Sequence, residues 1–278
     1  MLGKLIKHEF RATGRIMLPL LGAMLALSPV TGLIIKTFDR DGFGGIVQFL
    51  GGTFVVLFFM AVAGICVTSV VLMVRRFSSN LLQDEGYLMF TLPVSTHSLI
   101  WSKLIVSFVW FVVAAASSTA FIAITALVSE AEADISFIII FADDLTQLVG
   151  GWNIAAYIAE ALLCLFLFSC TICLHFYAAM ALGHSFTDHK TFLSICFYVV
   201  LSIGMSWLLY IVMGAFGNGI LSGLSHIMDM RIDGMVSARD YVLVPHMLFL
   251  TGGIYLLITA ALYYIPTILP LKKRLNIN

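Results

Sequence analysis

The segment RRFSSNLLQDEGYLMFTLPVSTHSLIWSK, residues 75–103, separates two long apolar runs of this chain. The cations Arg75 and Arg76 end the run before it, and Lys103 begins the run after it. Lys and Arg gather at the cytoplasmic ends of membrane-spanning helices. The sequence therefore predicts that this segment lies in the cytosol, between two membrane spans.

A short helix is predicted inside this segment, from Asn80 to Phe90, with Ser79 or Asn80 as its N-cap. Pro93 ends it, because proline cannot continue a helix. Many of its residues are too bulky and apolar for a plain solvated linker: Leu81, Leu82, Tyr87, Leu88, Met89 and Phe90. Two interpretations follow, a docking surface for a cytosolic partner or a loop folded back on its own helix ends.

The sequence LLQDEGYLMFTLPVSTHSLIWSKL, residues 81–104, resembles the cytosolic loop between the second and third spans of exporter-type (type 2) ABC transporter permeases. In that family the loop holds a coupling helix, which sits in a cleft of the ATP-binding subunit. The resemblance implies that contacts with such a partner are made by Leu81, Leu82, Asp84, Glu85, Gly86, Tyr87, Leu88 and Phe90. It also implies a second permease chain, forming a homodimer or a heterodimer.

No GxxxxGK[ST] motif for binding nucleotide phosphates occurs in this chain. If ATP drives the protein, we expect ATP and Mg to bind to the partner subunit. We therefore predict no cofactor in this chain and no enzymatic activity of its own.

The composition is that of an integral membrane protein. The 278 residues are 61% hydrophobic and 11% charged, with a mean hydropathy of +1.05. Soluble domains carry about 25% charged residues. The formal net charge of zero argues against a nucleic-acid partner. The 5 cysteines all lie inside apolar runs, so they are interpreted as small packing residues rather than disulfides or metal ligands.

Six apolar runs are long enough to cross a hydrocarbon core of about 30 Å. We predict spans over residues 16–35, 46–74, 99–128, 153–182, 191–216 and 246–271. Most of the 15 basic residues then lie on one side: Lys4, Lys7, Arg11, Arg15, Arg75, Arg76, Lys103, Lys190, Lys272, Lys273 and Arg274. This asymmetry predicts both termini in the cytosol and a multi-pass location in the cytoplasmic membrane. The predicted fold is an all-α membrane protein with a single transmembrane domain over residues 1–278.

Three further segments complete this picture. Residues 1–15 have one basic and one apolar helical face, which predicts an amphipathic helix in the inner membrane interface. The alternative is the start of a cleaved signal peptide. We expect residues 217–245 to form one or two short external helices between the fifth and sixth spans. By resemblance, the inner loop at 183–190 makes a second, smaller contact with the ATP-binding subunit.

Polar residues recur along one helical face of the fourth span: Asn153, Tyr157, Glu160, Cys164, Thr171 and His175. Glu160 is the one acid within a predicted span, and a charge at membrane depth normally faces protein or water. One interpretation is a substrate or gating surface, with candidate pathway residues Asn153, Tyr157, Glu160, Thr171 and His175. The other is a helix packing seam with Glu160 near the outer interface.

The first hypothesis is a membrane-spanning permease subunit of an ATP-driven ABC exporter. It would move a peptide, drug or lipid-like substrate across the cytoplasmic membrane by alternating access. The alternatives are an ATP-independent channel or secondary carrier, and an intramembrane enzyme or haem subunit. The last class has few candidate residues, namely Glu160, His175 and His246, and no GxSG or HExxH motif accompanies them. We predict neither catalytic residues nor a metal site.

Overall fold

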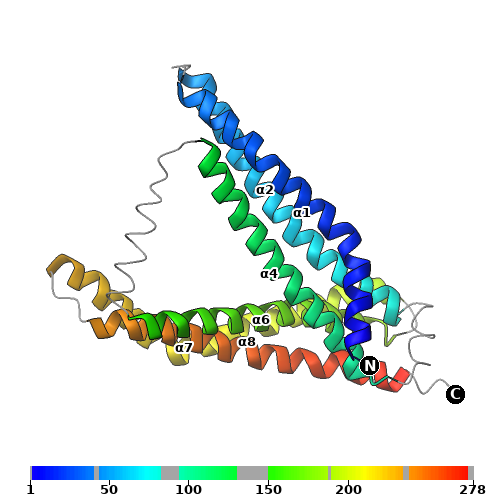
Figure 1. Ribbon diagram of the computed structural model, residues 1–278. Helices are drawn as coiled ribbons and strands as arrows, with labels where there is room; N and C mark the ends of the chain where they lie inside the picture. Colours follow the sequence, from blue (N-terminus) through cyan, green and yellow to red (C-terminus); the bar gives the residue numbers. More distant parts are fainter. Residues whose placement is uncertain are drawn as a thin grey trace. The chain divides into compact units, whose positions relative to one another are not determined.

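The computed structural model describes residues 2–40, 44–82, 94–129, 150–186, 189–233 and 238–274. These residues form six long helices and one short π-helical turn, η1 (Figure 1). The helices are α1 (Leu2–Arg40), α2 (Gly44–Phe77), α4 (Thr96–Ser129), α6 (Gly151–Gly183), α7 (Lys190–Asp233) and α8 (Ala238–Arg274), and η1 is Ser78–Leu82. The described part of the chain contains no strand, which confirms the all-helical prediction.

Each of the six helices has a segment long and apolar enough to cross a membrane. These segments are Leu2–Lys36, Phe59–Leu82, Thr96–Ser129, Gly151–Gly183, Lys190–Gly217 and Val242–Leu271. Each overlaps a predicted span. Large apolar side chains face outward on these helices, as on Phe59 and Trp207, which are 64% and 65% exposed. A surface of this kind suits a lipid surrounding, and the prediction of a multi-pass membrane protein is confirmed.

Two predicted boundaries were wrong. Residues 2–15 are not a separate helix, because α1 continues without a break to Arg40. The reason is that Glu9 and Thr13 are buried on the same face as the residues of the span that follows, so one packed face runs through both parts. Likewise, residues 217–233 are no separate external helix but the last turns of α7, and α8 begins at Ala238.

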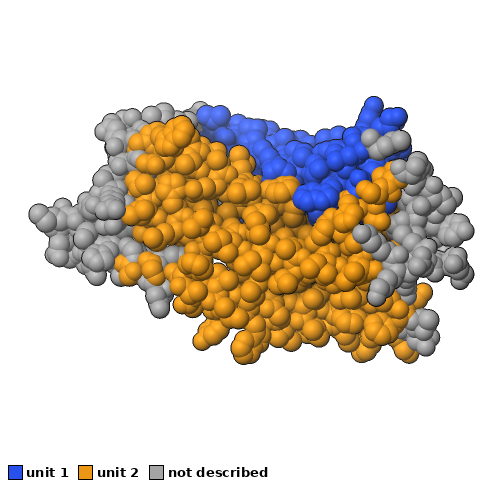
Figure 2. Space-filling view, turned by 90° about the horizontal axis from the view of Figure 1, so that it is seen from below, with its two compact units in different colours: residues 1–76, 98–138 blue, residues 77–97, 139–278 orange. Residues whose placement is uncertain are grey.

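The chain divides into two compact units (Figure 2). Unit 1 comprises Met1–Arg76 and Ser98–Ile138, and unit 2 comprises Phe77–His97 and Ile139–Asn278. Among the described helices, unit 1 therefore holds α1, all of α2 except its last residue Phe77, and most of α4. Unit 2 holds η1, α6, α7 and α8.

In unit 1, α1 runs antiparallel to α2 and parallel to α4. Thr13 receives a 2.8 Å hydrogen bond from the Trp110 indole, and Thr125 donates to the Ser28 carbonyl at 3.2 Å, with the same separation of 97 residues in both pairs. The close approach continues at Gly32, where an added Cβ would lie 2.7 Å from the Val128 Cβ. Glycine is thus required for the contact between these two helices.

In unit 2, α6 contacts both α7 and α8, and α7 contacts α8. The half of α6 near Gly183 is its most buried part, with Cys173, Leu174 and Tyr177 at most 2% exposed. Polar side chains elsewhere on α6 also face its two neighbours, and these contacts form the candidate site.

Candidate functional site

A repeated hydrogen-bond pattern joins α6 to α8. Tyr157 Oη donates to the Val242 carbonyl at 2.9 Å. Two further side chains repeat this contact at seven-residue steps, and in each pair the acceptor lies 85 residues further along. They are Cys164 Sγ to the Phe249 carbonyl at 3.5 Å and Thr171 Oγ1 to the Leu256 carbonyl at 3.3 Å. The constant separation means that α6 and α8 run parallel in register, with the heptad spacing of supercoiled helices.

An acid–imidazole pair lies within the same seam. His246 Nδ1 is 2.8 and 2.9 Å from the two carboxylate oxygens of Glu160. The Tyr157 ring packs against the imidazole, with ring centroids 4.5 Å apart. The Glu160 side chain is 36% exposed and that of His246 27%, so the pair is only partly covered within this chain. Placing a carboxylate inside a membrane span costs free energy, and the contact with His246 reduces that cost for Glu160.

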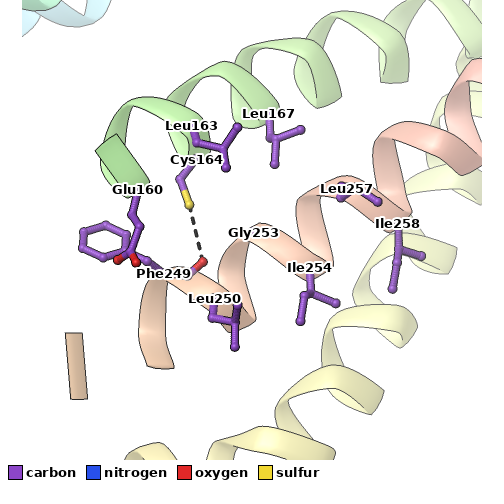
Figure 3. A pocket seen from close by; sticks show the side chains of 10 residues that line it. All are labelled: Glu160, Leu163, Cys164, Leu167, Phe249, Leu250, Gly253, Ile254, Leu257 and Ile258. Atoms are coloured by element: carbon purple, nitrogen blue, oxygen red, sulfur yellow. Dashed lines mark hydrogen bonds between the residues drawn. The ribbon is translucent and has the colours of Figure 1, made fainter. Parts of the chain in front are cut away.

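An apolar groove opens beside this pair, with a volume of about 260 Å³ (Figure 3). Glu160 and Phe249 lie at one end, and Leu257 and Ile258 lie at the other. Gly253, in the middle, keeps α8 free of a side chain where Cys164 faces it. Chemically, the groove offers a hydrocarbon surface that ends at the Glu160 carboxylate.

The candidate pathway residues do not all point to one place. Tyr157, Glu160 and Thr171 face α8, as described above. His175 instead contacts Ser202 on α7, with 3.1 Å between Nε2 and Oγ, and its ring lies edge-on to Tyr198 and Tyr263. It lies about 22 Å from Glu160 along α6, at 1.5 Å per residue.

Asn153 is half-buried near the start of α6. The polar stripe is thus a contact of α6 with two neighbouring helices. Its role in a substrate pathway stays a prediction.

Sequence reasoning missed a buried charge cluster in unit 1. Glu9, which is 7% exposed, accepts from Lys103 Nζ at 2.6 Å and from an Arg76 guanidinium nitrogen at 3.3 Å. One carboxylate on α1 thereby binds cations near the ends of α2 and α4 that flank residues 83–93. A signal was present in the sequence, since Glu9 is the only acid before Asp39 and is surrounded by cations.

The predicted coupling helix is described only at its start. Ser79 and Asn80 lie inside η1, directly after α2, so neither is the N-cap of a new helix there. Leu81 is 4% exposed and packs within this chain, whereas Leu82 is half-buried. The other expected partner contacts lie outside the described residues: Asp84, Glu85, Gly86, Tyr87, Leu88 and Phe90.

Side chains of α6 and α8 contact both ends of the segment that joins α2 to α4. Phe77 stacks on Tyr177 of α6, with ring centroids 4.0 Å apart and an interplanar angle of 7°. At the other end, His97 Nδ1 is 2.7 Å from the Tyr264 hydroxyl of α8. Helices α6 and α8, which carry the polar seam, are thus also the helices that hold this segment.

Comparisons of the chain with protein-family models, with curated proteins and with solved structures found no match. The fold and the site therefore define the class of protein but not its family. This is a multi-pass helical membrane protein with a paired acid and imidazole between two parallel spans.

Proposed function

We propose that this chain is the permease subunit of an ATP-driven exporter in the cytoplasmic membrane, with ATP hydrolysed by a separate chain. One observation supports this most, namely how the cytosolic segment is attached. Arg76 is bound by Glu9 in unit 1, and the next residue, Phe77, stacks on Tyr177 in unit 2. A force applied to residues 83–93 would therefore act on the helices of both units.

The same arrangement recurs where the segment ends. His97 is bonded to unit 2, and Lys103, less than two turns later on α4, is bonded to Glu9 in unit 1. In the proposed mechanism, closure of the ATP-binding partners pushes the segment, and the two units rearrange to give alternating access. The resemblance of residues 81–104 to permease coupling loops supplies the kind of partner. A second permease chain would complete the transporter, with the termini of both chains in the cytosol.

The burial of Leu81 narrows the surface available to the partner. Because Leu81 packs within the chain, the apolar anchors left for docking are Leu82, Leu88, Met89 and Phe90. Asp84 and Glu85 would lie at the rim, where charges alter the association rate more than the stability of the complex. The substrate class that suits the groove beside Glu160 is peptide-, drug- or lipid-like, since such molecules carry long apolar parts.

The test is co-purification of the ATP-binding chain with the wild type and with Leu82→Ala/Phe90→Ala. Fully burying one such side chain contributes about 1.5–3 kcal/mol, so losing two should weaken docking by a factor on the order of a hundred or more. The matched control is Phe59→Ala/Leu127→Ala, which removes the same two residue types from side chains that are each 64% exposed. Binding and stimulated ATP hydrolysis that survive the first pair unchanged would contradict the proposal.

The Glu160–His246 pair favours a second candidate, an ion-coupled secondary carrier. Paired acids and histidines inside spans are typical of proton relays in transporters. The two candidates differ in what stops transport in energised vesicles. Depleting ATP at a maintained proton gradient stops an ATP-driven exporter, whereas a protonophore at constant ATP stops a proton-coupled carrier.

A further inference from the structure

A second cavity, of about 380 Å³, lies in unit 2 between α6 and α7, with α8 contributing Tyr255. It shares no lining residue with the groove of Figure 3. Its polar lining consists of hydroxyl and imidazole groups: Thr171, His175, Tyr198, Ser202, Ser206 and Tyr255. None of its lining residues is a Lys, Arg, Asp or Glu.

Four of the five hydroxyl groups that line this cavity donate their protons to backbone carbonyls. Ser202 donates to the Tyr198 carbonyl at 2.8 Å, and Ser206 to the Ser202 carbonyl at 3.0 Å. Thr171 and Tyr255 do the same, to Leu167 at 2.8 Å and Met205 at 3.5 Å. Each of these four hydroxyl oxygens keeps lone pairs but has no proton left to offer. The cavity is therefore rich in acceptors.

The donor and acceptor nitrogens of His175 can be assigned in the same way. Since the Ser202 proton is used on Tyr198, Ser202 Oγ accepts from His175 Nε2–H. In a neutral imidazole the other nitrogen, Nδ1, is then an acceptor. His175 is 6% exposed, and its Nδ1 meets no hydrogen-bond partner within the described residues. The imidazole thus adds no free donor to the cavity.

Aromatic rings form a further part of the wall, beside the aliphatic residues Ile172, Met205 and Leu209. Phe168, Phe176, Tyr198 and Tyr255 all line the cavity, and Phe176 stacks on Tyr198 with ring centroids 5.1 Å apart. Aromatic faces attract cations, and the attraction is larger where water is excluded. Tyr198 is 37% exposed, so a small molecule can reach its ring.

We propose that this cavity binds a small primary ammonium compound with an apolar body. The ammonium group would donate to the hydroxyl oxygens of Ser202 and Ser206 while it lies against the Tyr198 ring. The volume suits a small molecule rather than a peptide. The site needs neither ATP nor a partner chain, so it stands apart from the proposed transport function.

The experiment is equilibrium dialysis of the full chain in lipid nanodiscs against 2-phenylethylammonium, 2-phenylethanol and phenylacetate. These probes share one apolar body and differ in charge and donor groups. The ammonium probe should bind at least about tenfold more tightly than either of the others. Tyr198→Leu should weaken its binding about 5- to 30-fold, because a cation–aromatic contact is lost. Tyr210→Leu is the matched control, since Tyr210 is 76% exposed on the same helix and does not line the cavity.

A second cavity variant keeps the proposal testable even if Tyr198→Leu fails to fold. Ser206→Ala removes one exposed acceptor and should weaken binding about 3- to 10-fold. Ser222→Ala, also exposed on α7, should leave binding unchanged. Equal affinity for the ammonium and the alcohol would overturn the proposal, as would equal effects of a cavity variant and its control.

Discussion

Replacing Glu9 by Gln removes the negative charge that lies 2.6 Å from Lys103 Nζ while it keeps the shape of the side chain. The Lys103 residue is 2% exposed, and Glu9 is 7% exposed. Removing one partner of a buried ion pair typically costs about 3–5 kcal/mol, because the other charge stays buried. We expect Glu9→Gln to lower the free energy of unfolding by an amount in that range.

The second cation of the cluster provides an internal comparison. The Arg76 side chain is 32% exposed, and its contact with Glu9 is longer, at 3.3 Å. A solvent-exposed ion pair contributes about 0–1 kcal/mol, so Arg76→Gln should have a much smaller effect than Glu9→Gln. The double variant Glu9→Gln/Lys103→Met should be less destabilised than Glu9→Gln alone, since no buried charge then remains at that contact.

The assay is reversible unfolding in mixed micelles with increasing SDS, followed by the fluorescence of Trp110, which is bonded to Thr13 one turn from Glu9. The other tryptophans are replaced by Phe for this purpose. Loss of less than about 1 kcal/mol in Glu9→Gln would refute the reasoning. Strictly additive effects in the double variant would refute it as well.

Three further results are expected. Gly32→Ala should destabilise unit 1 by about 1–3 kcal/mol in the same assay, since its Cβ would lie 2.7 Å from the Val128 Cβ, whereas Gly22→Ala, with nothing within 4 Å, should be neutral or slightly stabilising. A double-mutant cycle of Glu160→Gln and His246→Gln should give a coupling energy of about 1 kcal/mol, and a value of zero would mean that the pair contributes nothing. Single cysteines introduced for Ser78, Asp188 and Ser237 in a cysteine-free chain should react with an impermeant reagent on intact cells only at position 237; labelling at position 78 would contradict six spans with cytosolic termini.

The spans were predictable because each run of apolar residues must form its backbone hydrogen bonds internally in lipid, and a helix is the only way to do so for a single segment. The ends of these spans were harder to predict from the sequence. At α1 the change from basic amphipathic sequence to apolar sequence suggested two helices, but no residue there stops a helix. Glu9 and Thr13 instead continue the buried face of the span.

The polar face of α6 was found from its spacing alone, but its neighbours were not. Periodicity shows which residues share a face and carries no information about which helix covers it. His246 and the carbonyls of α8 lie about 85 residues away, and only the packing of unit 2 pairs them with Glu160 and Tyr157. The Glu9 cluster is hard to predict for a related reason, since Arg76 and Lys103 equally fit the pattern of cations that mark membrane orientation.

The proposed function requires that residues 82–90 contact an ATP-binding chain in the cytosol. The most direct measurement places a photo-cross-linking amino acid at Tyr87, with the same substitution at Tyr210, which is 76% exposed on a span, as the control. Co-expressed with the ATP-binding chain and irradiated, the protein should give one adduct from position 87, with the mass of the ATP-binding chain, and none from position 210. Adducts of position 87 with lipid alone, or equal adducts from both positions, would contradict the account.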